Sequence, residues 1–474
     1  MTSAAAAGGG KPLTMKDVTV TDPGVVKRAV GAAMVGNITE WYDFGVFANL
    51  EATLGDVFLS PAGDTMKTIG TAILFAIAFT VRPFGGLFFG PLGDRIGRTK
   101  VLAITVILMA SATFLIAFIP DYNTIGMAAP LLMVFLRLVQ GFSTGGEYAG
   151  AMTFIAEYAP DKRRGFFGSF LEYGTAIGYL MGAIMSLGVS LMPHDFVMSW
   201  GWRIPFLVAG PIGLIGLYLR MKLEETPAFQ AVAKESEARE GSQSLKELKE
   251  IAIKFWKPIL ICGGLVVCWN GVNYVLTTTM PAYFNSYNKP ITENHVSEYL
   301  QIGSLAIMLF IIPFIGKLSD KIGRKPVMFT GVGLIIVLAI PSTLLTQSTS
   351  VPMVAGGMVM MTLMLLCFNS TSPSTLPSLF PTEVRYGGLS VAFNISISAF
   401  CGTATVIITS LIAATGDHNW PGYYLIFVGV LGLVALFFMK ESANRPMQGT
   451  PPAVATEEEA RELVEASQRA AEKA

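Results

Sequence analysis

Ionisable side chains stand inside long apolar stretches of this chain, namely Glu40, Asp43, Arg137 and Glu147. A charge at bilayer depth costs about 2.5–3.5 kcal/mol on insertion scales, so such residues are usually paired and functional. Burial favours the neutral form of a carboxyl group, whereas a neighbouring arginine favours the carboxylate. A carboxyl group that exchanges its arginine partner can therefore bind and release a proton. We predict that Glu40, Asp43 and Glu147 are proton-coupling residues with Arg137 as their counter-charge; the alternative is a static buried ion pair.

Polar and aromatic residues accompany these charges at helical spacing. Asn37, Glu40 and Trp41 share one face of a predicted helix, because residues three and four positions apart are neighbours on a helix surface. The acids fall mostly in the first half of the chain, whereas the second half offers neutral groups such as Trp269 and Asn273. This asymmetry indicates that any proton chemistry belongs to the first half.

The elements that must position these residues are apolar segments long enough to cross a bilayer. Of the 474 residues, 52% are hydrophobic and 14% charged, whereas about a quarter of an ordinary soluble domain is charged. This composition excludes a cytosolic enzyme and a disordered protein.

Arg82 and Arg203 lie near predicted segment ends, where we expect them to extend toward the interface. The predicted helices cover residues 29–54, 68–91, 101–119, 128–157, 167–191, 200–220, 257–283, 299–317, 326–346, 352–375, 387–413 and 421–440.

Lysine and arginine in the short loops predict the orientation of the chain. They gather before the first segment and in alternate loops, for example Arg95 to Lys100, Lys162 to Arg164 and Lys321 to Lys325. Under the positive-inside rule these loops and both termini are cytoplasmic, and the number of crossings is even. The predicted organisation is a cytoplasmic N-terminal segment, a six-helix bundle, a cytoplasmic linker, a second six-helix bundle and a cytoplasmic tail, at 1–28, 29–220, 221–256, 257–440 and 441–474.

An internal repeat relates the two halves. The loop GPLGDRIGRTK (residues 90–100) reappears as GKLSDKIGRKP (residues 316–326), so that Asp94 corresponds to Asp320. A repeat of this kind predicts two homologous six-helix units with a site at their interface. Charges in such a loop can latch one state and release in another; the alternative is a static topology signal. The predicted latch residues are Asp94, Arg95, Gly97, Arg98, Asp320, Gly323 and Arg324.

With these motifs the chain resembles the major facilitator superfamily, and within it the metabolite:proton symporters. The resemblance is carried by GNITEWYDFGVF, RPFGGLFFGPLGDRIGR, RLVQGFSTGGEYAGA, GWRIPF and LEETPAF, which begin at residues 36, 82, 137, 201 and 223. It implies an all-α membrane protein of twelve transmembrane helices in two pseudo-symmetric bundles. It also implies proton-coupled uptake by alternating access in a bacterial inner membrane, of a small zwitterionic compatible solute such as proline or glycine betaine.

A zwitterion needs a cation for its carboxylate, which Arg137 can supply, and a surface for its ammonium group. Aromatic faces suit a quaternary ammonium, which has no N–H to donate. The predicted solute-binding residues are Asn37, Trp41, Tyr42, Gln140, Tyr173, Trp269, Asn270, Asn273, Tyr274 and Asn369. Packing or lipid contact is the alternative for each aromatic residue.

Two other functions stay open from the sequence. A dicarboxylate or related acid (2-oxoglutarate, citrate or shikimate) would demand two converging cations, and only Arg137 stands clearly at mid-depth. A solute sensor that does not transport would not need duplicated latch loops. We expect no enzyme activity, cofactor, metal or nucleic acid, and the partners to be solute, proton and lipid bilayer. The oligomeric state, a monomer included, is left open.

Overall fold

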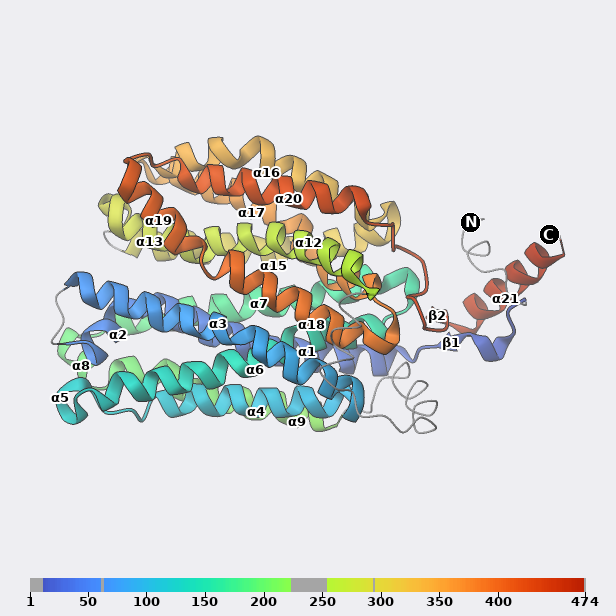
Figure 1. Cartoon of the computed structure of the whole chain (residues 1–474), viewed down its shortest axis with the longest axis horizontal. Coiled ribbons are helices and arrows are strands. Elements are labelled where there is room, and N and C mark those ends of the chain that lie inside the picture. Colours follow the sequence, from blue (N-terminus) through green and yellow to red (C-terminus); the bar gives the residue numbers. More distant parts are fainter. Residues whose placement is uncertain (1–11, 61–63, 223–253, 293–294, 473–474) are drawn as a thin grey trace.

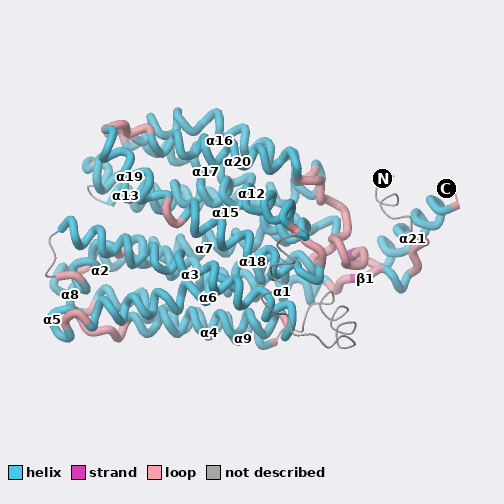
Figure 2. Tube along the Cα trace, in the orientation of Figure 1, coloured by secondary structure: helices cyan, strands magenta, loops and turns pink. Residues whose placement is uncertain are grey.

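The computed structural model describes residues 12–60, 64–222, 254–292 and 295–472, without some side chains, among them those of Asp94, Arg95 and Arg98. Most of the predicted cytoplasmic linker lies outside the described residues. Almost all of the described chain is helical (Figure 2). A membrane favours this outcome, because only a helix satisfies every backbone polar group within one segment.

The first half contains six long helices joined by short ones. Its long helices are α1 (Pro23–Asn49), α3 (Asp64–Ile96), α4 (Arg98–Ile116), α6 (Ala128–Tyr158), α7 (Arg164–Ser190) and α9 (Ile204–Met221). The short helices α2 (Glu51–Phe58), α5 (Tyr122–Ile125) and α8 (His194–Ser199) lie at one end of this bundle (Figure 1).

The second half repeats this arrangement. Its helices are α12 (Trp256–Tyr274), α13 (Met280–Tyr287), α14 (Lys289–Thr292), α15 (Val296–Ile322), α16 (Arg324–Thr346), α17 (Val351–Thr375), α18 (Arg385–Ser396), α19 (Ala404–Thr415) and α20 (Trp420–Phe438). Single π-helical turns at Val275–Thr279 and Ile397–Cys401 join α12 to α13 and α18 to α19, so that each pair forms one crossing.

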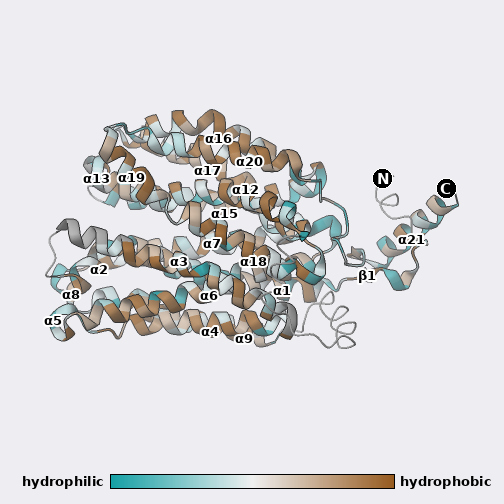
Figure 3. Ribbon diagram, viewed as in Figure 1, coloured by the Kyte–Doolittle hydropathy of each residue, from teal (hydrophilic) through white to brown (hydrophobic). Residues whose placement is uncertain are grey.

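Eleven helices of the described chain are long and apolar enough to cross a membrane. Helix α1 is not among them, although its 27 residues suffice in length, because charged side chains such as Glu40 and Asp43 lie inside it. The surface that faces outward is apolar, with Phe310 76% and Phe314 73% exposed (Figure 3). With α1, the chain forms the twelve-helix fold that the sequence predicts.

The two halves meet through helices that carry small residues. Helix α3 packs against α18, and α7 packs against α15 and α17. A Cβ atom added at Gly93 would lie 2.1 Å from the Tyr386 ring, and one at Gly165 would lie 2.5 Å from Ser319 Oγ. Glycine is therefore required for the close approach of these helices, as is common between membrane helices.

Segments before α1 and after α20 pair with each other at one end of the molecule (Figure 1). Strand β1 (Thr19–Val20) lies parallel to β2 (Ala453–Val454), and α21 (Glu457–Ala471) follows β2. At the start of helix α21 the Thr456 hydroxyl accepts from the Glu459 amide, and the Glu459 carboxylate accepts from the Ala455 amide. The tail after residue 440 was predicted from the sequence, but this strand pair was not.

Candidate functional site

Asp43 and Arg137 form a buried ion pair inside the first half. The Asp43 carboxylate lies 3.2 Å from Arg137 Nη1, and both side chains are fully buried. Gln140 donates to Asp43 Oδ1 at 2.9 Å and accepts from Arg137 at 3.0 Å. The guanidinium also lies 4.0 Å from the centre of the Phe47 ring. Asp43 and Arg137 are therefore partners, as predicted, and Gln140 forms hydrogen bonds with both of them.

A second buried ion pair joins α1 to α3. Arg82 Nη2 lies 2.6 Å from Glu40 Oε1, and neither side chain is more than 1% exposed. The expectation that Arg82 extends to the membrane interface was wrong, because α3 continues to Ile96 and Glu40 supplies a buried partner. Arg203 does lie near a helix end, where it donates to the carbonyls of Ala117 and Ile119.

A chain of polar contacts runs from α1 to α7 and α6. The Trp41 indole donates to Asn37 Oδ1 at 3.1 Å, and the Asn37 amide donates to the Thr175 hydroxyl at 2.6 Å. Thr175 donates in turn to Glu172 Oε1 at 3.1 Å, and the same oxygen accepts from the Tyr148 hydroxyl. All five side chains are buried, so these donors and acceptors satisfy one another in the absence of bulk water.

Aromatic rings from both halves meet beside this chain. We call Trp41, Tyr148, Tyr179, Trp269 and Phe393 the central aromatic cluster. The Trp41 ring lies 5.1 Å from Tyr179 and 6.1 Å from Tyr148. Tyr148 stacks on Phe393 at 4.9 Å and lies 6.1 Å from Trp269, both in the second half. The Trp269 indole donates to Asn369 Oδ1 at 2.5 Å, which fixes its orientation.

Some predicted solute-binding residues lie in the cluster or next to it. Asn37, Trp41, Trp269 and Asn369 belong there by the contacts above. Tyr274 contacts Phe79 of the first half, with ring centres 5.4 Å apart.

Other predicted residues lie elsewhere. Tyr42 donates to the Pro205 carbonyl at 2.8 Å, which ties α1 to α9 within the first half. Tyr173 is partly buried against Phe170. Asn270 donates to the Val266 carbonyl of its own helix at 3.3 Å. Asn273 and Glu147 are buried, at 5% and 1% exposure.

Several residues of this region were not among the site residues predicted from the sequence. Tyr148 and Phe393 were not selected, although Tyr148 directly follows the selected Glu147 and faces the second half. Glu172 was not selected, and its neighbour Tyr173 was chosen instead. The one-residue difference reflects about 100° of helix rotation, which sequence alone leaves undetermined unless the inward face is known.

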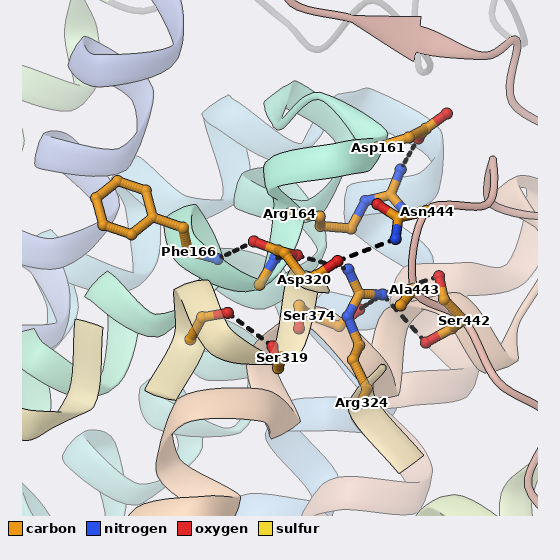
Figure 4. A network of polar contacts seen from close by, with 12 residues as sticks. Asp161, Arg164, Phe166, Ser319, Asp320, Arg324, Ser374, Ser442, Ala443 and Asn444 are labelled. Carbon is orange, nitrogen blue, oxygen red and sulfur yellow. Dashed lines mark hydrogen bonds and ion pairs between the residues drawn. The ribbon is translucent and has the colours of Figure 1, made fainter. Parts of the chain in front are cut away.

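The predicted latch of the second half joins the two halves directly. The Asp320 carboxylate accepts from the backbone amides of Gly165 and Phe166 at 2.7 and 2.8 Å (Figure 4). These amides belong to the first turn of α7, where unpaired N–H groups favour an anion. Arg324 lies 3.6 Å from Asp320 and donates to the carbonyl and hydroxyl of Ser442, each at 3.1 Å.

The matching loop of the first half agrees in backbone conformation. Gly97 has φ 109° and Gly323 has φ 102°, and each precedes a helix of its own half, α4 or α16. Both angles lie in the region that favours glycine. The side chains of Asp94, Arg95 and Arg98 lie outside the described residues, so their part in the latch stays a prediction.

Further contacts hold the same end of the molecule together. Arg385 Nη1 of α18 lies 2.7 Å from Glu157 of α6, which gives a second bond between the halves. Residues 441–454, which we call the strap, cross this end. The carbonyl of Arg445 accepts from Arg164 at 3.1 Å, and that of Gln448 accepts from Arg385 at 2.8 Å. We call this region, from Asp320 to the strap, the closed end.

Comparison with known proteins assigns the family. Residues 29–453 match the family described as "Sugar (and other) transporter". The chain belongs to this family. It is therefore a solute transporter of the major facilitator superfamily, a multi-pass membrane protein and not an enzyme.

Curated relatives are similar over nearly their whole length. The chain is 43% identical to the "Proline/betaine transporter" of Escherichia coli K12, over 96% of this chain and 91% of that protein. It is equally identical, over the same shares, to the "Glycine betaine/proline/ectoine/pipecolic acid transporter OusA" of Dickeya dadantii. It is 38% identical to the "Ectoine/proline transporter ProP" of Corynebacterium glutamicum, over 95% and 91%.

Solved structures share the fold. The proton:xylose symporter XylE bound to 6-bromo-6-deoxy-D-glucose superposes with a TM-score of 0.72, at 17% identity over 90% of this chain and 98% of that one. Inward-open XylE from E. coli superposes with a TM-score of 0.60, at 20% identity over 88% and 97%. These likenesses confirm the predicted major facilitator fold.

Proposed function

We propose that the protein takes up a small zwitterionic compatible solute, such as proline or glycine betaine, together with protons. The carrying observation is the 43% identity, over nearly the whole chain, to transporters named for these solutes. The central aromatic cluster supports the same class, because its rings come from both halves and can hold an ammonium group between them.

Arg82 is the better candidate to hold the solute carboxylate, in place of the predicted Arg137. Its guanidinium lies 5.8 Å from the centre of the Trp41 ring, which belongs to the cluster. Arg137 instead contacts Phe47 and the Leu74 carbonyl, within the first half. Arg82 pairs with Glu40 in the described state, so a solute carboxylate would share or replace that partner. A dicarboxylate would need a second cation beside the cluster, and Arg137 pairs with Asp43 instead, which favours a zwitterion.

Proton coupling would use buried carboxyl groups of the first half, for which Glu40, Asp43 and Glu147 with Arg137 stay our prediction. All four side chains are at most 1% exposed. Ionised groups are retained at such positions only with partners, and usually for function.

The closed end would face the cytoplasm, because it carries the Lys- and Arg-rich loops. In this orientation the described state is closed to the cytoplasm, and both terminal segments lie on that side of a bacterial inner membrane. Alternating access then requires the bonds of Asp320 and Arg385 to break as the halves rock.

The test is radiolabelled uptake into proteoliposomes under an imposed proton gradient. We expect glycine betaine and proline to accumulate, and a protonophore to abolish the accumulation. Preferential accumulation of 2-oxoglutarate or citrate would instead assign the dicarboxylate class, and binding without uptake would assign a sensor. Buffers of two osmolalities in the same panel show whether uptake depends on osmotic strength.

A further inference from the structure

We propose that Glu172 carries the coupled proton and that Tyr148 links its protonation to the position of the second half. This inference rests on the proposed function, proton-driven solute uptake, and places the coupled proton on Glu172 instead of the predicted Glu40, Asp43 and Glu147. Glu172 lies on α7 with 2% of its surface exposed.

Glu172 differs from its buried neighbours in the partners it has. Among the residues that the structure describes, no basic side chain lies within ion-pair distance of it. Its hydrogen-bond partners are hydroxyl groups, those of Tyr148 and Thr175. Burial of an ionised carboxylate without a cation costs several kcal/mol, whereas a neutral acid with hydroxyl donors avoids that cost.

Glu40 and Asp43 are arranged in the opposite way. Each holds an arginine, Arg82 at 2.6 Å and Arg137 at 3.2 Å. Protonation of either acid would leave a fully buried arginine without its counter-charge, which is strongly unfavourable. In the described state these two pairs therefore keep their charges, and Glu172 is a buried acid that can gain or lose a proton at lower cost than Glu40 or Asp43.

Tyr148 supplies the connection to conformation. Its hydroxyl donates to Glu172 within the first half, while its ring stacks on Phe393 and lies beside Trp269 of the second half. When the halves rock, the two ring contacts must change because their partners lie in the other half. The hydroxyl bond to Glu172 changes with them, so that protonation and opening are coupled.

The proposed step transfers one proton to and from the Glu172 carboxyl group. Glu172 takes one proton from water on the side from which solute enters, and becomes a neutral acid. After the halves rock, it gives that proton to water on the other side. One proton has then crossed with each solute, with no bond made or broken other than O–H. The bound solute shares the cycle, because Trp41 reaches Glu172 through Asn37 and Thr175.

The variant Glu172→Gln tests this assignment, because glutamine keeps the shape and accepts the same hydroxyl bonds but carries no exchangeable proton. In proteoliposomes we expect it to lose accumulation driven by a proton gradient. We expect it to keep solute exchange between labelled inside and unlabelled outside, with a rate that no longer depends on pH.

A matched control is Glu51→Gln. Glu51 on α2 is also a carboxyl group bonded to a hydroxyl, that of Thr71 at 3.1 Å, but Thr71 is not a member of the central aromatic cluster, whereas Tyr148 is. We expect this variant to keep both accumulation and the pH dependence of exchange.

Two results would overturn the inference. One is gradient-driven accumulation by Glu172→Gln at the level of the unmodified protein. The other is loss of exchange as well as accumulation in a variant that unfolds at the unmodified temperature, which would make Glu172 a structural or solute-binding residue. If Glu172→Gln does not fold, Tyr148→Phe decides: a shifted pH profile of exchange supports the inference, and an unchanged profile refutes it. Failure of the unmodified protein to use a proton gradient would instead refute the proposed function.

Discussion

Two regions of this molecule hold buried arginine–carboxylate contacts, and they differ in which parts they join. At the centre, the pairs Glu40–Arg82 and Asp43–Arg137 lie wholly within the first half. At the closed end, Arg385 pairs with Glu157 across the two halves, and the Asp320 carboxylate accepts from two backbone amides of α7 (Figure 4). A rocking motion of rigid halves leaves the first kind intact and must break the second. The central pairs thus stabilise a bundle, and the closed-end contacts stabilise one state.

The difference also changes the expected role of Arg137. We predicted that an arginine exchanges its carboxylate partner between states. Since Arg137 and Asp43 belong to one half, rocking alone does not separate them. The group whose surroundings do include the other half is Tyr148, through Phe393 and Trp269. The proposed coupling between proton and conformation is therefore more direct at Tyr148 and Glu172.

The largest effect is expected from breaking a central pair. Arg82→Ala leaves Glu40 buried without its cation, which should cost about 3–5 kcal/mol of stability. Thermal unfolding in detergent measures this loss, and uptake should be abolished. The double variant Glu40→Gln, Arg82→Gln removes both charges and should recover most of the stability without recovering uptake. Equal destabilisation by the single and double variants would show that the pair is not the cause.

A smaller effect is expected at the closed end, and on the populations of states more than on folding. Asp320→Asn replaces two charge-assisted bonds to Gly165 and Phe166 by neutral ones. Bonds to charged groups contribute about 1.5–3 kcal/mol each, so the closed state should lose population roughly tenfold or more. Distances between spin labels on α7 and α15 report this change. Asp43→Asn, within one half, should leave the same distance distribution unchanged; a shift there too would remove the distinction.

The close contact of Gly165 at the closed end gives a further test of this comparison. A Cβ at Gly165 would lie 2.5 Å from Ser319 Oγ and 2.7 Å from the Gly316 carbonyl. Gly165→Ala should therefore open the closed end at a cost of about 1–3 kcal/mol. Gly303→Ala on α15 is the control, because a Cβ there meets nothing within 4 Å. The same spin-label distances should be altered by the first variant only.

The smallest effect is expected at the strap, where pH acts through Glu441. Burial opposes ionisation of Glu441, but amides of Ala443, Lys325, Arg324 and Ser442 donate to it, and its pKa is lowered below the ordinary 4.5. A lowered pKa contributes stability above 4.5 that is lost as pH falls through the folded value. Glu441→Gln should cost roughly 0.5–2 kcal/mol near neutral pH, as loss of a helix cap does. Thermal unfolding should show this difference vanish on acidification below the lowered pKa; a difference that persists there would contradict the assignment.

Much of the fold was predictable because membrane constraints act locally. Segment length, polarity and the repeated loops around Gly97 and Gly323 predicted twelve helices in two related halves, and family membership confirms that fold. The partner of Arg82 was not predictable, since it depends on how far α3 extends and where Glu40 faces. The strand pair β1–β2 was also missed, because two-residue strands 434 positions apart leave no periodic signal.

Some members of the central aromatic cluster could be predicted from the sequence and others could not. Trp41 and Trp269 were found from polar residues on the same helix face, whereas Tyr148 and Phe393 lie one residue, or about 100° of helix rotation, from the polar Glu147 and Asn394. What the sequence lacked was the rotation of α6 and α18 about their axes. That rotation is set by packing between the halves, for example by the Asn394 amide that donates to the Gly145 carbonyl at 2.6 Å.

One cross-linking measurement tests most directly whether the closed end must open during transport. A Cβ at Gly168 of α7 would lie 3.1 Å from Ser374 Cβ of α17, close to disulfide spacing. In a background that lacks the four native cysteines, oxidation of Gly168→Cys, Ser374→Cys should abolish glycine betaine uptake, and reduction should restore it. The pair Gly264→Cys, Ala435→Cys, within the second half, should cross-link without loss of uptake. Full uptake with a complete cross-link between α7 and α17 would contradict the account.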